Sequence, residues 1–224
     1  MPDKDARSDA APPREKMFNV PAPVLLIAVS MPVLFFLQLR LPDGGAAMAF
    51  SPADLQQGRW GGLFTAMLIH LSWAHALVNA VAAVTFGAPV ARLFGERYGS
   101  TVFLLFYVAC GVLASLGYGL IHWGSTETMA GASGAVFGLI GAATRLLGGN
   151  GRVRPLMDRQ VIAASVGWMA ANAVTGLIGF APGAQGVQIA WEAHAVGFVV
   201  GLLAIGPLGR MFGKGPQSTE TPLI

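Results

Sequence analysis

Charged residues are scarce in this chain. Asp, Glu, Lys and Arg together make up 11% of the 224 residues, whereas 54% are hydrophobic. An average soluble domain carries about 25% charged residues, so too little charge is present to cover a soluble surface. The mean hydropathy of +0.60 points the same way. The composition therefore predicts a membrane protein.

Cysteine is almost absent as well. Cys110 stands alone, which excludes a disulfide framework and a multi-cysteine metal site within this sequence. Glycine-rich phosphate-binding motifs and zinc-finger spacings are also missing. The net charge of +3 comes from basic residues scattered between apolar segments. We therefore expect no metal, no cofactor and no nucleic-acid partner.

Long apolar runs dominate what is present. A membrane-spanning helix needs about 20 mostly apolar residues, with about 17 as the lower limit. Six runs predict an all-α, six-span bundle over residues 18–210, between a disordered tail at 1–17 and a C-terminal tail at 211–224. The connection 40–72 is predicted to be a structured loop at the membrane surface. The runs are Val20–Leu39, Trp73–Pro89, Ser100–Ile121, Gly131–Leu147, Val161–Ala181 and Ala193–Leu208.

Basic residues are distributed unevenly among the connections between these runs. Cytoplasmic loops of membrane proteins carry an excess of Lys and Arg. Only Arg40 and Arg59 fall on one side of the predicted topology. We therefore expect both termini in the cytoplasm and the loop 40–72 outside. The residues on the cytoplasmic side are Lys4, Arg7, Arg14, Lys16, Arg92, Arg97, Arg145, Arg152, Arg154, Arg159, Arg210 and Lys214.

Polar side chains converge at the outer ends of the second, fourth and sixth runs. His75 and Asn79 lie four residues apart in the second run and share a helix face. Ser133 begins the fourth run and His194 begins the sixth. Polar and ionisable groups inside spans are costly and indicate function. These residues are therefore predicted to form one site.

The residue types in this set predict nucleophilic catalysis. A serine hydroxyl becomes an effective nucleophile when a base, usually histidine, takes its proton. His194 is predicted to serve Ser133 in this way, because small residues on the fourth and sixth runs favour close packing of these two helices. The small residues are Gly134, Gly138, Gly197 and Gly201.

The predicted catalytic unit is a Ser–His dyad. No carboxylate stands in a third position, because Glu192 precedes His194 by two residues and points to another helix face. Phe137, one turn after the serine, either packs against the imidazole or makes an ordinary apolar contact. His75, Asn79 and backbone N–H groups at the start of the fourth run are predicted to stabilise the oxyanion of the tetrahedral intermediate.

These motifs, in this order, resemble those of the rhomboid family of intramembrane serine proteases. Residues 70–79, HLSWAHALVN, resemble the family's His that lies five residues before His-x-x-x-Asn. Residues 131–134, GASG, match Gly-x-Ser-Gly, and residues 193–201, AHAVGFVVG, match Ala-His-x-x-Gly-x-x-x-Gly. The resemblance extends over about residues 18–210.

The resemblance implies a role for each matched residue. Ser133 would be the nucleophile, His194 its base, and His75 and Asn79 part of the oxyanion site. Family members cleave single-span membrane proteins near a helix end without metal or cofactor. The basic bacterial architecture has six spans and both termini cytoplasmic, which implies the inner membrane here. His70 would support the active-site region or its water, and Gly131 and Gly134 belong to the matched motif. Phe137, one turn after the serine, is the other supporting residue.

Two positions depart from the family pattern, and two other functions remain open. Arg59-Trp60 inverts a Trp-Arg pair of many members, and Phe137 stands where many have Tyr. One alternative is a non-catalytic rhomboid-like protein that binds membrane clients, although such relatives typically lack the Ser or the His. The other is a small transporter, but inverted repeats and midplane acidic residues are absent from the six runs.

The sequence also predicts a gate over the serine. The glycine-containing loop 182–191 and the fifth run, which carries Trp168, are expected to cover Ser133 and to limit the access of a helical substrate. Loops with little packed side-chain area open at low cost.

Overall fold

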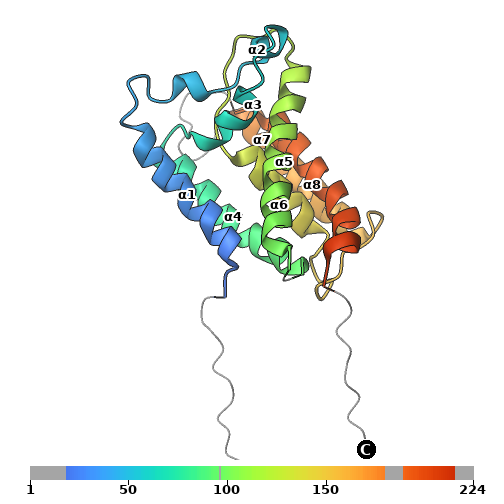
Figure 1. Ribbon diagram of the computed structural model, residues 1–224. Coiled ribbons are helices and arrows are strands. Elements are labelled where there is room, and N and C mark those ends of the chain that lie inside the picture. The colour runs from blue at the N-terminus through green and yellow to red at the C-terminus, as the bar shows by residue number, and fades with distance from the viewer. Residues whose placement is uncertain (1–18, 96, 180–188, 215–224) are drawn as a thin grey trace, which may run out of the picture.

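The computed structural model describes residues 19–95, 97–179 and 189–214, and all regular structure in these ranges is helical. This confirms the all-α prediction. Each of the six apolar runs corresponds to one helix, and these helices are arranged as a bundle (Figure 1). They are α1 (Ala22–Gln38), α4 (Trp73–Leu93), α5 (Gly99–Ile121), α6 (Ser133–Thr144), α7 (Arg159–Ile178) and α8 (Trp191–Phe212).

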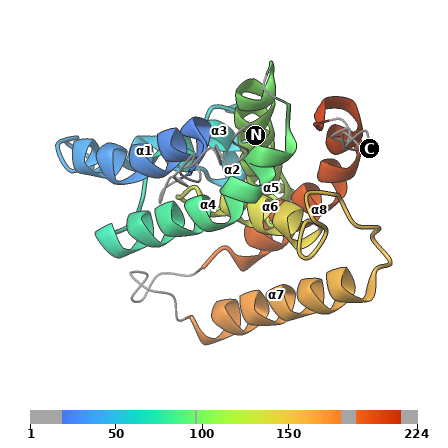
Figure 2. The same ribbon diagram turned by 90° about the horizontal axis from the view of Figure 1, so that it is seen from below.

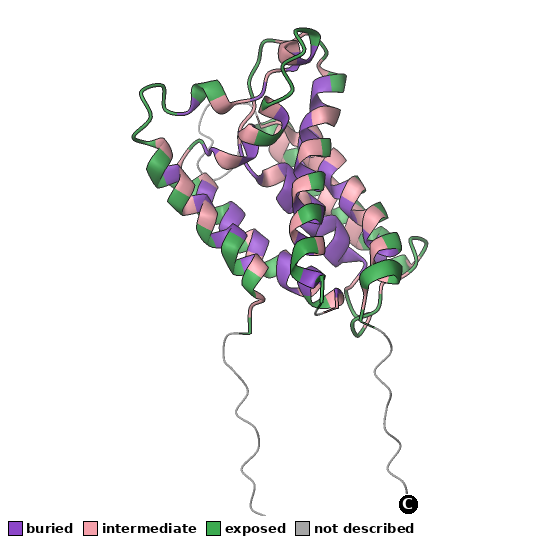
Figure 3. Cartoon of the chain, viewed as in Figure 1, coloured by how far each residue is buried: buried purple, intermediate pink, exposed green. Residues whose placement is uncertain are grey.

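The outer surface of the bundle is apolar. Four helices, α4, α5, α7 and α8, are long and apolar enough to cross a membrane, whereas α1 and α6 are apolar but shorter. Large apolar side chains point outward, as on α4, where Val81 is 66% exposed, and on α7, where Leu177 is 82% exposed. Buried residues gather where the helices face one another (Figure 3). Apolar patches of this extent mark a membrane-facing surface, as expected for an integral membrane protein.

The short helix α6 lies at the centre of the bundle. Nearly all of its side chains are buried, and α4, α5 and α8 pack around it. A Cβ atom added at Gly201 of α8 would lie 1.9 Å from the backbone oxygen of Gly138, and one at Gly197 would lie 2.1 Å from that of Gly134. Only glycine permits this helix separation, so the predicted small-residue faces do bring α6 and α8 together.

Helix α7 is the least embedded of the long helices. Only 11% of its most apolar stretch is buried, compared with 44% for α4 and for α5. Figure 2 shows α7 set apart at one side of the molecule. Trp168 of α7 meets Phe86 of α4 edge to face, with ring centroids 5.3 Å apart. The backbone of α7 at Gly176 packs against the Trp191 side chain at the start of α8.

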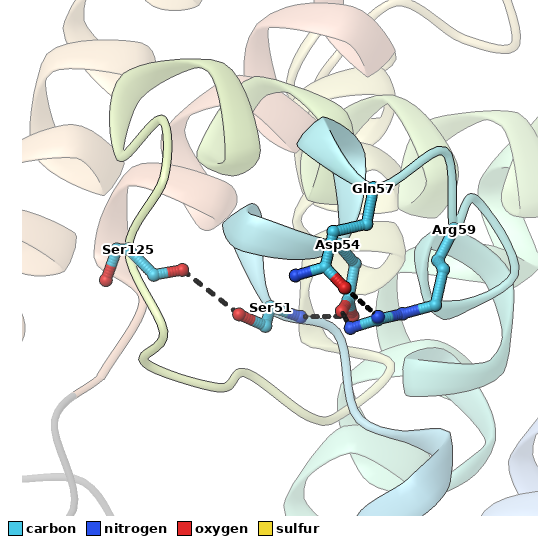
Figure 4. A network of polar contacts seen from close by, with 5 residues as sticks. All are labelled: Ser51, Asp54, Gln57, Arg59 and Ser125. Carbon is cyan, nitrogen blue, oxygen red and sulfur yellow. Dashed lines mark hydrogen bonds and ion pairs between the residues drawn. The ribbon is translucent and has the colours of Figure 1, made fainter.

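The connection between α1 and α4 is structured, as predicted. Ser51 and Asp54 form a capping box at the start of α2, and the Ser51 hydroxyl donates to the Ser125 carbonyl oxygen at 3.0 Å (Figure 4). The Arg59 side chain bonds to Asp54 and Gln57. Arg59 therefore braces this loop internally. The short helices of the connection are η1 (Ala46–Met48), α2 (Pro52–Gln56), α3 (Gly62–Thr65) and η2 (Ala66–Leu68).

Helix α1 begins and α8 ends at the same end of the bundle (Figure 1). Helix α8 continues to Phe212, two residues beyond the predicted end of the folded part at residue 210. The predicted tail at 1–17 lies outside the described residues, as does 180–188, which includes most of the predicted gate loop and the end of the fifth apolar run.

Candidate active site

Ser133 is the first residue of α6. The preceding Gly131 has a φ of +125°, a conformation that side chains rarely adopt, and a Cβ atom there would lie 2.6 Å from His75 Cε1. Glycine thus lets the His75 ring lie against the turn that leads into the helix. Because the first N–H groups of a helix have no intrahelical acceptor, the start of α6 offers backbone donors next to Ser133.

His194 lies in the first turn of α8 and faces Ser133. Its Nε2 atom is 2.7 Å from Ser133 Oγ, which is hydrogen-bonding distance. The Phe137 ring stacks on the imidazole, with centroids 4.4 Å apart and planes inclined by 4°. Phe137 follows Ser133 by four residues, so one face of α6 presents both side chains to His194. Close packing of α6 and α8 therefore brings these three predicted residues together.

A further polar partner of His194 was not among the predicted residues. Asn172 of α7 places its Oδ1 atom 3.0 Å from His194 Nδ1, and its Nδ2 atom donates to the Trp191 carbonyl oxygen at 2.8 Å. Glu192, the carboxylate nearest to His194 in the sequence, instead lies 3.3 Å from His122 Nε2. A strongly polar amide in an apolar run was the signal that could have identified Asn172.

His75 and Asn79 lie on α4 and line the same cavity as Ser133. The Leu71 N–H lies 3.5 Å from His75 Nδ1, a long contact for a hydrogen bond. His75 Nε2 lies 3.0 Å from the position of a Cβ atom at Gly131. Asn79 Nδ2 donates to the His75 carbonyl oxygen at 2.9 Å and keeps a second N–H. Among the described residues, neither side chain is hydrogen-bonded to the Ser–His pair.

His70 lies just before α4 in the wall of the cavity. It is 1% exposed, and neither of its ring nitrogens has a hydrogen-bond partner among the described residues. Its ring meets that of His75 edge to face, at 5.3 Å between centroids. Burial, together with a smaller repulsion from His75, lowers the pKa of His70 to about 4. The ring is therefore neutral near pH 7.

One cavity of about 650 Å³ connects these residues. Its walls come from the connection that follows α1, from the facing sides of α4 and α7, and from the starts of α6 and α8. Phe86 of α4 and Trp168 of α7 line it on either side. In the described part of the chain, no group of three or more His, Cys, Asp or Glu residues could hold a metal ion. The side chains that line the cavity suit nucleophilic catalysis by a serine that a histidine activates.

Comparison with known proteins points to one family. The model of the rhomboid domain matches residues 57–211. The chain is 34% identical to the rhomboid protease GluP of Bacillus subtilis over 126 residues. These residues make up 53% of this chain and 23% of GluP. It is 33% identical to the putative rhomboid protease YdcA of the same organism over 88 residues. These residues make up 38% of this chain and 40% of YdcA.

A fungal relative extends the similarity further along the chain. Rhomboid-type serine protease 2 of Emericella nidulans is 27% identical over 164 residues, which is 72% of this chain and 29% of the relative. The chain thus spans less than half the length of each of these curated relatives.

Proposed function

Because the chain belongs to the rhomboid family, we propose that it is an intramembrane serine endopeptidase that cleaves single-span membrane proteins near a helix end. The contact of 2.7 Å between His194 Nε2 and Ser133 Oγ is the observation that carries the proposal. Relatives named as rhomboid proteases, one of them as a rhomboid-type serine protease, support the same activity. Its partners would be transmembrane substrates and the surrounding lipid.

The proposed reaction is acyl transfer to Ser133 followed by hydrolysis. His194 Nε2 takes the hydroxyl proton while Oγ bonds to the carbonyl carbon of the scissile peptide. When the tetrahedral intermediate collapses, the C–N bond breaks and the imidazolium gives its proton to the leaving amine. Water, deprotonated by the same imidazole, then attacks the acyl-enzyme, and a carboxylic acid and free Ser133 result.

The oxyanion of both tetrahedral intermediates would be held by donors around the start of α6. The donors would be the free N–H groups of the first helical turn and His75, whose Nε2 lies 3.0 Å from the position of a Cβ atom at Gly131. The second N–H of Asn79 adds a donor on the same face of α4. Gly131 leaves room for the His75 ring beside this turn, and Gly134 lets α6 pack closely against Ala114 of α5.

We expect His75→Ala and Asn79→Ala each to reduce cleavage of a model single-span substrate only in part. Loss of one oxyanion donor typically costs about 10²–10³ in rate, but the backbone donors of α6 remain in these variants. The double variant should lose more than either single variant. Cleavage rates of the four proteins measured in the same detergent test this, and a double variant as fast as wild type would assign both side chains a structural role.

The proposed topology has six spans with both termini in the cytoplasm, most simply in a bacterial inner membrane. At 1.5 Å per residue, the 12 residues of α6 extend about 18 Å, against a hydrocarbon thickness of about 30 Å. Ser133 would then lie below the outer surface of the membrane. Water for hydrolysis would reach it through the cavity, whose wall includes residues of the outer connection 43–49.

We propose that the substrate helix reaches Ser133 between α4 and α7. Helix α7 is the least embedded long helix, and its contact with α4 rests on the aromatic pair Phe86 and Trp168. The cavity continues between these two helices from Ser133. A small outward movement of α7 would open this side, because little packed surface opposes it.

Weakening the contact between α4 and α7 should therefore speed the cleavage of transmembrane substrates. We expect Trp168→Ala to raise the rate for a single-span substrate and to leave the reaction of Ser133 with a small fluorophosphonate unchanged. The matched control is Trp123→Ala, which removes an exposed tryptophan that does not line the cavity. Equal changes in both rates, or no change in either, would place substrate access elsewhere.

Proteolysis itself is tested with the purified chain and a single-span substrate in liposomes. The account predicts two fragments whose new termini, located by mass spectrometry, lie near one end of the substrate helix. Binding of the intact substrate without cleavage would instead favour the non-catalytic, client-binding alternative.

A further inference from the structure

The orientation of the Asn172 amide follows from its two partners. The side chain is 4% exposed and bridges α7 to α8. An amide group has one oxygen, which accepts, and one nitrogen, which donates. Its partner Trp191 offers a carbonyl oxygen, which can only accept, at 2.8 Å. The nitrogen of Asn172 must therefore face Trp191, and the oxygen must face His194.

The amide oxygen in turn determines which nitrogen of His194 carries the proton. Asn172 Oδ1 lies 3.0 Å from His194 Nδ1 and can only accept, so Nδ1 is the protonated nitrogen of the neutral ring. The unprotonated Nε2 then faces Ser133 Oγ at 2.7 Å. This is the tautomer that a base needs in order to take the serine proton.

We propose that Asn172 is the positioning residue of the catalytic base, and that the unit is Ser133–His194–Asn172 rather than a dyad. This proposal deepens the proposed protease function and rests on it. Phe137 stacks on the ring but offers no acceptor that would select a tautomer. Glu192, the acidic residue of the first turn of α8, contacts His122 instead.

The same helix would then control both substrate access and activation of the serine. Trp168, at the contact with α4, lies one turn before Asn172 on the same face of α7. The acceptor for His194 Nδ1–H thus lies on the helix that borders the access route, and it holds the base in the closed position of α7.

The test measures the rate at which a small fluorophosphonate labels the full chain in detergent micelles, as a function of pH. The variants are Asn172→Ala and Asn172→Asp. The matched control is Ser165→Ala, which removes a polar side chain from the same helix whose hydroxyl has no hydrogen-bond partner among the described residues. His75 of α4 lines the same cavity as the ring, Glu192 lies in the first turn of α8, and both are retained in every variant.

Asn172→Ala should label at least about tenfold more slowly than wild type, because part of the 10²–10⁴-fold contribution of a positioned base is lost. The control should label like wild type. Asn172→Asp keeps an acceptor for Nδ1–H, so it should label faster than Asn172→Ala. Its negative charge favours the protonated imidazole. The base is then neutral only at higher pH, and the acid limb of the profile should move to higher pH than in wild type.

Two outcomes would overturn the positioning role. If Asn172→Ala labels at the wild-type rate and cleaves transmembrane substrates faster, Asn172 only tethers α7, and the protease function stands. If Asn172→Asp labels no faster than Asn172→Ala and its acid limb does not move, the residue makes no functional contact with the imidazole. A wild-type protein that does not label at all would instead contradict the proposed function itself.

Discussion

Replacing His194 by alanine is expected to lower the cleavage of a single-span substrate by at least about 10⁴-fold, because removal of the base from a serine enzyme removes most of the catalysis. The imidazole is the only side chain within hydrogen-bonding distance of Ser133 Oγ among the described residues. The measurement compares initial rates of purified proteins in the same detergent.

The fold of the His194→Ala variant has to be checked separately, since the ring also stacks on Phe137 and bonds to Asn172. Thermal unfolding followed by circular dichroism provides this control. A correctly folded variant that retains more than a small fraction of wild-type cleavage would contradict the role of His194 as base.

The second large effect is expected at a residue that never contacts substrate. A Cβ atom at Gly201 would lie 1.9 Å from the Gly138 backbone oxygen, so Gly201→Val forces α8 away from α6. A misplacement of about 1 Å can cost about 10² in rate, and the distance between Ser133 and His194 depends on this helix contact. We therefore expect cleavage to fall at least about 10²-fold, with Gly201→Ala intermediate.

A glycine on another helix provides the matched control for this prediction. A Cβ atom at Gly167 of α7 meets no atom within 4 Å, so Gly167→Val should keep wild-type cleavage and stability. Overpacking at Gly201 should also lower the unfolding temperature, since such changes typically cost about 1–3 kcal/mol. Wild-type activity in Gly201→Val would show that α6 and α8 do not need this close approach.

The close approach of α6 and α8 could be predicted because it depends on the local spacing of small residues along each helix. Glycines spaced four apart form a face next to Ser133 on one helix and share the face of His194 on the other, and such spacing acts through the geometry of a single helix. The all-α class could be predicted from apolar runs for the same reason. The hydrogen bond between Asn172 and His194 could not, because it depends on how α7 is rotated and placed against α8, which no periodicity within α7 encodes.

The connection between α1 and α4 likewise has features that local sequence predicts and one that it does not. Its length and apolar stretches predicted a structured loop, and Ser51 and Asp54 carry the local signature of a capping box. The backbone pairing of Phe50 with Met129, which docks this loop on the segment before α6, joins residues far apart in sequence. Contacts of that kind arise from tertiary packing, and local propensity does not specify them.

We expect Ser133 to be an activated nucleophile inside a membrane protein. The most direct measurement is reaction of the purified wild-type chain with a fluorophosphonate, followed by mass spectrometry of the labelled peptide, with Ser133→Ala treated in parallel. We expect a single covalent adduct on Ser133 in wild type, no adduct in Ser133→Ala, and parallel loss of substrate cleavage. A folded wild-type protein without an adduct, or an adduct that persists in Ser133→Ala, would contradict it.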